Sequence, residues 1–124
     1  MNIEYKDNVL YIKAPNVLVG DKTIDFESKI IPIVLCLNIR YITISLEDID
    51  FIDKKGVNSI IKLSQLVGKN NGKVVLCNLN DYIKSSFKKT DIFDYCFKSK
   101  NYKSSLEVFK IWVISIKEYL NQLI

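Results

Sequence analysis

The sequence predicts a single α/β domain whose central mixed β-sheet opens with a hairpin and carries its helices chiefly on one side. Short β-prone runs alternate with longer stretches of helical periodicity, which is typical of a mostly parallel sheet with right-handed crossovers. The 124 residues suffice for one domain and are too few for two. A composition of 48% hydrophobic and 26% charged residues is that of a globular chain rather than a disordered one.

The first half of the chain is expected to form a hairpin, a helix and a strand. Two β-prone runs, 3–5 and 9–13, flank the turn residues 6–8 and predict the hairpin. Residues 41–46 alternate as a strand does, with Ile42, Ile44 and Leu46 on one side. Between them a helix is expected from about Thr23, and Pro32 should kink it or mark its restart. Its predicted apolar face comprises Ile24, Phe26 or Glu27, Ile30, Ile31, Val34 and Leu35.

The second half repeats the alternation. A helical stripe over 57–68 ends at the breakers Asn70-Asn71-Gly72, and the apolar run 73–79 predicts a strand covered on both faces. The next helix is expected to take Asp81 as its N-cap, and Phe97 to open a last short strand. Ile83 and Phe87 should face inward from that helix, and Ile92 and Phe93 should cover the end of the sheet. A long helix follows at about 104–123, with Ser104 or Ser105 and Glu107 as a capping box.

Composition also narrows the function. A net charge of +4, with lysines scattered among acidic residues and Arg40 as the single arginine, indicates a solvated surface rather than a nucleic-acid footprint. No run approaches the ~20 apolar residues of a membrane span, and the N-terminus lacks the features of a signal peptide. The three cysteines, Cys36, Cys77 and Cys96, sit among apolar neighbours and are interpreted as reduced, buried thiols of a cytoplasmic protein.

Catalytic and cofactor-binding patterns are missing from the sequence. There is no histidine and no CxxC pair, which disfavours a zinc or redox site. There is also no nucleophile–base pair, P-loop or dinucleotide glycine motif. We therefore expect neither an enzyme nor a bound cofactor or metal.

The most informative stretch is Leu46–Gly56, LEDIDFIDKKG, followed by the second helical pattern. Asp53 stands where an N-cap belongs and can accept hydrogen bonds from the free N–H groups that begin a helix. Gly56 allows close packing or an unusual backbone angle just inside that helix. Two lysines in the first turn oppose the helix dipole, at a cost of about 0.3–1 kcal/mol each when exposed.

This stretch resembles the strand-to-helix turn of the STAS family, whose bacterial members include anti-sigma-factor antagonists. In that family the turn usually reads Asp-Ser-Ser-Gly or Asp-Ser-Thr-Gly, and its second hydroxyl residue is phosphorylated by a partner kinase. Lys55 occupies that phosphoacceptor position here. The resemblance extends over nearly the whole chain, with Asp91-Ile92-Phe93 in place of a Gly-Leu-Phe-like motif. It implies one STAS-like domain over residues 1–124.

Two departures fall in the region that the family uses to contact partners. Val19 replaces an acidic loop residue, and Lys54-Lys55 replaces the hydroxyl pair. The partner-binding residues that the resemblance implies are Val19, Asp53, Lys54, Lys55, Gly56 and Ser59. The lysines indicate either a specialised surface or drift after loss of the kinase. Ser59, four residues beyond Lys55 on the same helix face, is either a displaced phosphosite or an ordinary small residue.

The final helix has more apolar surface than a surface helix needs. One stripe is widened by Val108, Trp112, Tyr119 and either Ile111 or Ile114. The stripe itself comprises Leu106, Phe109, Val113, Ile116, Leu120 and Leu123. Core packing, docking on a membrane surface and a protein interface are all open interpretations. For the last of these, Trp112 and Tyr119 are the candidate interface residues, and the partner could be a second copy of the chain.

The function expected from the resemblance is that of a non-enzymatic, protein-binding regulator similar to an anti-sigma-factor antagonist. Its partner would be an anti-sigma factor or a serine-kinase-like protein. A first alternative is a STAS-like accessory subunit of a membrane transport complex. A second alternative is a nucleotide- or small-ligand-binding sensor, against which the lack of a Gly-rich phosphate loop argues.

Overall fold

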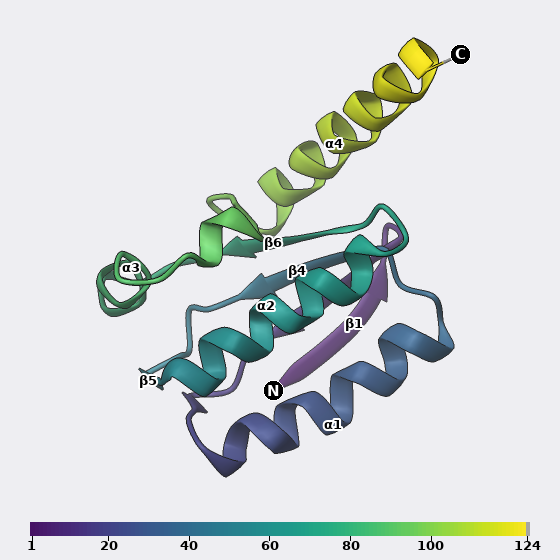
Figure 1. Cartoon of the computed structure of the whole chain (residues 1–124). Coiled ribbons are helices and arrows are strands. Elements are labelled where there is room, and N and C mark those ends of the chain that lie inside the picture. Colours follow the sequence, from purple (N-terminus) through teal and green to yellow (C-terminus); the bar gives the residue numbers. More distant parts are fainter. Residues whose placement is uncertain (124) are drawn as a thin grey trace.

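The computed structural model describes residues 1–123, which form a five-stranded mixed sheet with helices on both faces (Figure 1). The first two strands pair antiparallel, and every other neighbouring pair is parallel. The strands, in their order across the sheet, are β1 (Asn2–Lys6), β2 (Val9–Lys13), β4 (Tyr41–Ser45), β6 (Lys73–Cys77) and β7 (Phe97–Lys98). A separate parallel pair joins β3 (Val17–Leu18) to β5 (Phe51–Ile52). The predicted mixed sheet with its opening hairpin is confirmed.

Three helices and the sheet enclose the main hydrophobic core. These are α1 (Asp21–Cys36), α2 (Lys54–Gly68) and α3 (Asp81–Phe87), and a 3₁₀ turn, η1 (Ile92–Asp94), adds Ile92. The core side chains include Leu10, Ile12, Phe26, Ile30, Ile42, Ile44, Ile60, Leu63, Val74, Leu76, Ile83 and Phe87. Strands β4 and β6 are buried on both faces, as expected of central strands. The helices therefore lie chiefly on one side, as predicted.

The last helix, α4 (Tyr102–Leu123), crosses the opposite face of the sheet with its first half only. Phe109 packs there against Val9 and Val75, and the hydroxyls of Thr43 and Ser105 share a buried hydrogen bond of 2.8 Å. Beyond this contact the helix projects away from the domain (Figure 1). No helix within residues 1–123 has both the length and the apolar character needed to cross a membrane.

Several predicted details of the N-terminal half are wrong. Helix α1 begins at Asp21, close to the predicted start near Thr23, but it runs unbroken through Pro32 instead of restarting there. Pro32 is exposed, so the carbonyl that loses its donor lies on the solvent side of the helix. Ile24 and Leu35, assigned to the apolar face, are each 61% exposed, because the sheet covers a narrower arc centred on Phe26, Ile30 and Val34.

The predicted helix caps are also corrected. The cap of α3 is Asn80, whose side chain accepts from the Ile83 N–H at 2.8 Å, and Asp81 lies in the first turn. Helix α4 begins at Tyr102, and the Asn101 side chain accepts from the Ser104 N–H at 2.9 Å, so the serine capping box does not form. In both places an asparagine that precedes the predicted cap provides the accepting oxygen. Asn80 stands one residue before Asp81, and Asn101 stands three residues before Ser104.

Two predicted burials fail as well. Cys36 is exposed at the end of α1, whereas Cys77 and Cys96 are buried as expected. Phe93 is 40% exposed, although its neighbour Ile92 is fully buried at the end of the sheet. The predicted single domain runs to Ile124, which lies outside the described residues.

Candidate partner-binding site

The Asp53 carboxylate joins two loops at the end of the sheet where the parallel strands finish. One oxygen accepts from the Gly56 N–H at 2.9 Å and caps α2, as predicted, and the other accepts from the Gly20 N–H at 3.1 Å. The Gly56 N–H lowers the pKa of the Asp53 carboxyl against the opposing effect of desolvation, and the Gly20 N–H and the Lys55 ammonium add to the lowering. Asp53 therefore holds the start of α2 to the loop before α1.

Gly56 is required for close packing rather than for an unusual backbone angle. A Cβ atom built there would overlap the carbonyl oxygen of Leu18 and lie 2.7 Å from Cγ1 of Ile52. Gly20, in contrast, adopts a positive φ of 53° in the β3–α1 loop, where its neighbour Val19 is half-buried. The two glycines let this loop and the first turn of α2 approach each other closely.

Lys54 and Lys55 are exposed and diverge from the first turn of α2. Lys55 lines a shallow groove between α1 and α2 together with Ile24 and Glu27. Lys54 lines the groove on the other side of α2, with Lys89 and Asp94. Within residues 1–123 neither ammonium group forms an ion pair. The turn thus presents positive charge on both sides of the helix.

Residues 1–107 match the family model of the STAS domain, which spans the sheet, the Asp53–Gly56 turn and the first turns of α4. The chain belongs to the STAS family. Because the match ends at residue 107, most of α4 lies beyond the part of the chain that the family model covers. The search of curated proteins found no match.

Three solved structures illustrate how this STAS domain compares with others. A putative anti-sigma factor antagonist from Thermotoga maritima has a TM-score of 0.77 and 16% identity, covering 86% of this chain and 91% of its own. The anti-sigma factor antagonist SpoIIAA in its unphosphorylated form has a TM-score of 0.67 and 14% identity, with coverages of 89% and 96%. SLC26A9 has a TM-score of 0.52 and 18% identity over 73% of this chain and 18% of its own. At these identities the likeness shows the fold.

The structure brings together five of the six residues named as partner-binding. Val19 lies next to Gly20, which Asp53 binds, and Lys54, Lys55 and Gly56 complete the same edge of the STAS domain. Ser59 differs, because it is only 2% exposed in the seam between α1 and α2. Its hydroxyl has no hydrogen-bond partner among the described residues. A kinase could not reach Ser59 without opening this seam.

An exposed aromatic pair beside the turn was missed by the sequence analysis. Phe51 is 61% exposed and Tyr82 is 41% exposed, with their ring centroids 6.5 Å apart in an edge-on arrangement. The Tyr82 hydroxyl accepts from the Ile52 N–H at 3.0 Å, which fixes α3 to β5. In the sequence, the only sign that Phe51 faces solvent was its place next to Ile52, whose side chain points to the other side of the strand. Two residues are too few to establish such an alternation.

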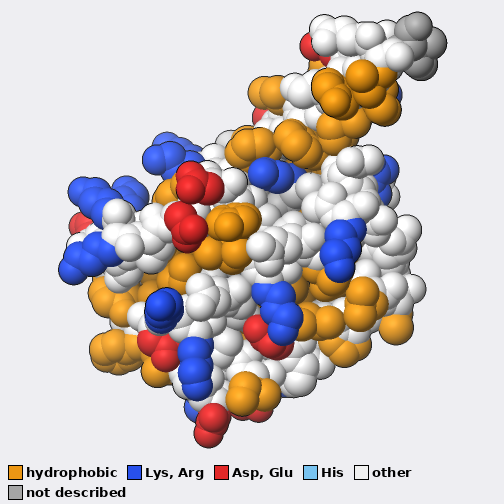
Figure 2. Space-filling model, in the orientation of Figure 1, with side chains coloured by type: hydrophobic (Ala, Val, Ile, Leu, Met, Phe, Trp, Pro, Cys, Tyr) orange, Lys and Arg blue, Asp and Glu red, His pale blue; other side chains and the backbone are white. Residues whose placement is uncertain are grey.

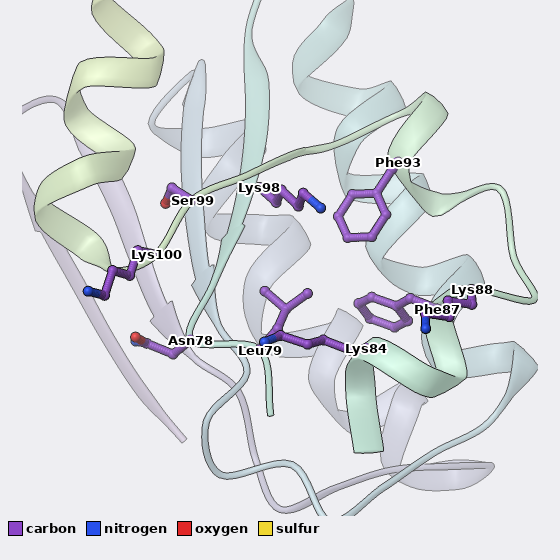
Figure 3. Close-up of a pocket in the computed structure, with 9 residues that line it drawn as sticks. All are labelled: Asn78, Leu79, Lys84, Phe87, Lys88, Phe93, Lys98, Ser99 and Lys100. Atoms are coloured by element: carbon purple, nitrogen blue, oxygen red, sulfur yellow. The ribbon is translucent and has the colours of Figure 1, made fainter. Parts of the chain in front are cut away.

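A basic pocket of about 690 Å³ lies beside α3, near the ends of β6 and β7 (Figure 3). Phe87 and Phe93 contact each other edge-on at 5.9 Å, and the Lys98 ammonium lies 5.5 Å from the centroid of the Phe93 ring. Lys84, Lys88 and Lys100 also line the pocket, together with Asn78, Leu79 and Ser99. Four lysines and two phenylalanine rings therefore line this pocket, a combination that suits an anion with an apolar part.

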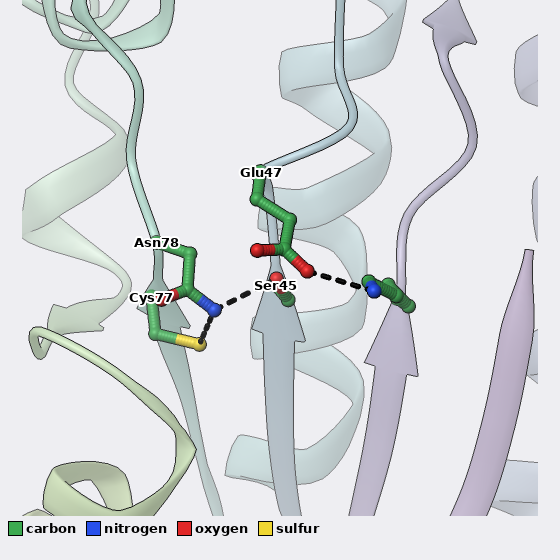
Figure 4. A network of polar contacts seen from close by, with 5 residues as sticks. Ser45, Glu47, Cys77 and Asn78 are labelled. Atoms are coloured by element: carbon green, nitrogen blue, oxygen red, sulfur yellow. Dashed lines mark hydrogen bonds and ion pairs between the residues drawn. The ribbon is translucent and has the colours of Figure 1, made fainter.

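A polar network fastens the ends of three central strands (Figure 4). The Asn78 side chain donates to the Ser45 hydroxyl at 3.0 Å and to the Cys77 sulfur at 3.7 Å. Lys13 and Glu47 form an ion pair at 2.8 Å, and the hydrogen bond to Glu47 raises the pKa of Lys13. Burial raises the pKa of the Cys77 thiol to about 11, so this thiol is protonated and unreactive at neutral pH. We assign the network a structural role.

No group of three or more histidine, cysteine, aspartate or glutamate side chains suited to a metal ion occurs within residues 1–123. The candidate site is a surface on which Lys54, Lys55, Phe51 and Tyr82 are exposed.

Proposed function

We propose that this protein is a non-enzymatic regulator that binds another protein, in the manner of an anti-sigma-factor antagonist that works without phosphorylation at its turn. The observation that carries the proposal is the rigid turn Asp53–Gly56, which presents Lys54 and Lys55 where the family carries its hydroxyl pair. We place the protein in the cytoplasm, where partners of this type act.

The chemistry of this edge favours a partner with an acidic contact surface. Lys54 and Lys55 are unpaired within the described part of the chain, so their ammonium groups are available to carboxylates. The exposed Phe51 and Tyr82 rings next to them offer the type of side chain that dominates interface energies. An anti-sigma factor or serine-kinase-like protein with acidic residues facing this edge is the partner that we propose.

Charge reversal at the turn tests this interface. Lys54→Glu with Lys55→Glu should weaken binding to the natively co-purified partner at least about tenfold, mainly by slowing association. Wild-type binding should weaken as salt rises, and the double variant should respond less, because screening acts on exposed charges. The variant should stay folded, since acidic residues suit the first turn of a helix.

The matched control is Lys29→Glu with Lys69→Glu. This pair makes the same change in net charge at two exposed lysines, one on α1 and one just beyond the far end of α2. It should bind the partner as the wild type does. Equal weakening by both pairs would show that only overall charge matters, and no weakening by either would place the interface elsewhere.

Loss of the phosphorylation switch is tested by restoring the acceptor. Lys55→Ser should become phosphorylated when incubated with the partner kinase and ATP, whereas the wild-type turn should remain unmodified by peptide mass spectrometry. Phosphate on Ser59 of the wild type would show that the switch has moved along the helix, and that the seam around this buried hydroxyl opens.

A second candidate function is an accessory subunit of a membrane transport complex. The partial likeness to SLC26A9 favours it: a segment that makes up 18% of that protein resembles this chain, with a TM-score of 0.52. Identification of the native partner separates the candidates: an ATPase or permease subunit supports this function, and a kinase-like regulator supports the first.

A small-ligand sensor is a third candidate, favoured by the basic pocket of Figure 3. Titration with labelled nucleotide, read by fluorescence anisotropy, tests it directly. Binding that is lost in Lys84→Glu with Lys98→Glu would support a ligand site in this pocket.

A further inference from the structure

The distal segment of α4, residues 111–123, carries several large apolar side chains that the rest of the domain does not cover. Ile111, Ile114, Tyr119, Leu120 and Leu123 are between 49% and 65% exposed. Figure 2 shows hydrophobic side chains exposed along the projecting helix. A helix in which so much apolar surface faces water normally has a partner.

The distal segment leaves the domain in a fixed direction. The Trp112 indole N–H donates to the carbonyl oxygen of Asn71 at 2.9 Å, and its ring contacts Phe97 edge-on at 5.7 Å. The Lys73 ammonium lies 5.3 Å from the same ring. Trp112 is therefore an anchor within the chain, half-buried at the edge of the domain, rather than a free interface residue.

The apolar stripe of α4 follows the spacing of a coiled coil. From Leu106 to Leu123 its members are separated by 3, 4, 3, 4 and 3 residues, which is the pattern of alternating a and d positions. The sheet covers the first part of the stripe through Phe109. Four members remain beyond it, Val113, Ile116, Leu120 and Leu123, which we call the distal stripe.

The distal stripe is self-complementary. Its spacings of 3, 4 and 3 residues read the same in both directions, so two antiparallel copies align every member. A two-fold axis that crosses the stripe at the height of residue 118 sets Val113 opposite Leu123 of the partner subunit, and Ile116 opposite Leu120 of the partner subunit. Isologous contacts of this type close a dimer without leaving the stripe free for further copies.

We propose that two copies of this chain dimerise through the distal stripes of their α4 helices, packed antiparallel about this axis. The inference does not depend on the proposed function. The Asp53–Gly56 turn lies at the carboxyl ends of the strands, whereas Trp112 binds Asn71 near the start of β6. The partner-binding edge of each copy therefore remains free, and the dimer carries two such edges.

The length of the projection fits this register. Thirteen residues of helix extend about 20 Å, so the tip of one copy ends beside Val113 of the other and the two domains stay apart. Val113 borders an apolar groove of about 590 Å³ formed with Val9, Tyr41 and Phe109. Leu123 of the partner subunit would cover the mouth of this groove.

The charges of the distal segment argue for a second copy over a membrane surface. Lys117 and Glu118 are its two charged side chains, so it lacks the basic polar face of a membrane-docking helix. In the antiparallel arrangement Tyr119 meets Tyr119 of the partner subunit on one flank. Lys117 faces Lys117 of the partner subunit on the other, so the dimer should tighten as salt rises, because like charges are screened.

Sedimentation velocity tests the dimer. The wild type should shift from monomer to twice the monomer mass as its concentration rises to about 1 mM, where even a millimolar dissociation constant populates the dimer. Leu120→Glu should remain monomeric and folded. Ile111→Glu, which changes a still more exposed apolar residue off the stripe, should dimerise as the wild type does.

Cysteine cross-linking tests the antiparallel register in a Cys36→Ser background, which removes the exposed native thiol. Val113→Cys with Leu123→Cys should form an intersubunit disulfide on mild oxidation. Val113→Cys alone should not, since its two copies would lie about 15 Å apart along the axis. A self-cross-linking Val113→Cys would overturn the antiparallel arrangement.

The dimer itself would be overturned by a wild type that stays monomeric at the highest concentration, even if it then bound anionic lipid vesicles. Equal loss of association in Ile111→Glu and Leu120→Glu would also overturn it, by showing unspecific apolar association.

Discussion

The first turn of α2 and the last turns of α4 both expose side chains of functional interest, but the rest of the chain supports them very differently. Around the α2 turn, Asp53 binds two loops and Gly56 leaves no room for a methyl group. The distal segment of α4 is anchored to the domain by Trp112 at its start and then projects away from it. Rigid support suits charges that must meet a partner in a set geometry, whereas an unsupported apolar helix needs a partner to cover it.

The family match follows the same division. It includes the turn and ends at residue 107, before the distal segment begins. The turn thus belongs to the part of the chain that matches the family, whereas the distal segment lies beyond it. Substitutions in the two regions should differ in what they change.

The largest contrast is expected within α4 itself. Phe109→Ala should lower the free energy of unfolding by about 3–5 kcal/mol, because it leaves a cavity against Val9 and Val75. Leu120→Ala should change it by less than about 0.5 kcal/mol at a low micromolar concentration, at which we expect the monomer to predominate. Chemical denaturation followed by circular dichroism measures both. Similar losses in the two variants would show that the distal segment packs on the domain.

A smaller contrast is expected within α2, between its two glycines. Gly56→Ala should destabilise the domain by about 1–3 kcal/mol, because the new methyl group would overlap the Leu18 carbonyl and crowd Ile52. Gly68→Ala meets nothing within 4 Å and should be neutral or stabilise by up to about 1 kcal/mol. Thermal melts of the two variants test this directly. A harmless Gly56→Ala would mean that β3 and α2 can separate, and that the turn is less rigid than the structure indicates.

Sequence reasoning succeeded where the deciding interactions are local. Alternating periodicities predicted the sheet and its helices, and the cap at Asp53 depends on a hydrogen bond three residues along the chain. It failed where neighbouring residues compete for one role, as with Asn80 against Asp81 and Asn101 against Ser104. All four can cap a helix, and the path of the preceding loop decides between them.

It also failed where the contact joins distant parts of the chain. The burial of Ser59 depends on how α1 covers α2, and the bond between Ile52 and Tyr82 spans 30 residues. Trp112 looked like core or interface from its spacing, and its partner Asn71 lies 41 residues away. Apolar neighbours suggested a buried Cys36, but the end of α1 points it to solvent.

The smallest effect concerns the Asp53 carboxylate and reports on how the turn is held. Asp53→Ala removes the cap of α2 and should cost about 0.5–2 kcal/mol. Asp53→Asn keeps an acceptor oxygen and removes the charge, so near neutral pH it should cost less than the alanine variant. Asp25→Asn, on the exposed side of α1, controls for the loss of one surface carboxylate.

The pH dependence separates the charge from the hydrogen bond. The folded-state pKa of Asp53 is lowered, first by the Gly56 N–H, so its charged form stabilises the fold above the unfolded-state pKa of about 3.9. That stabilisation is lost as the pH falls through the lower, folded-state pKa. The difference in Tm between wild type and Asp53→Asn should therefore be constant from about pH 7 to 5 and shrink below about pH 4. A difference that persists in acid would mean that the carboxylate acts through its shape and hydrogen bonds alone, and that the lysines beside it receive no electrostatic support from the cap.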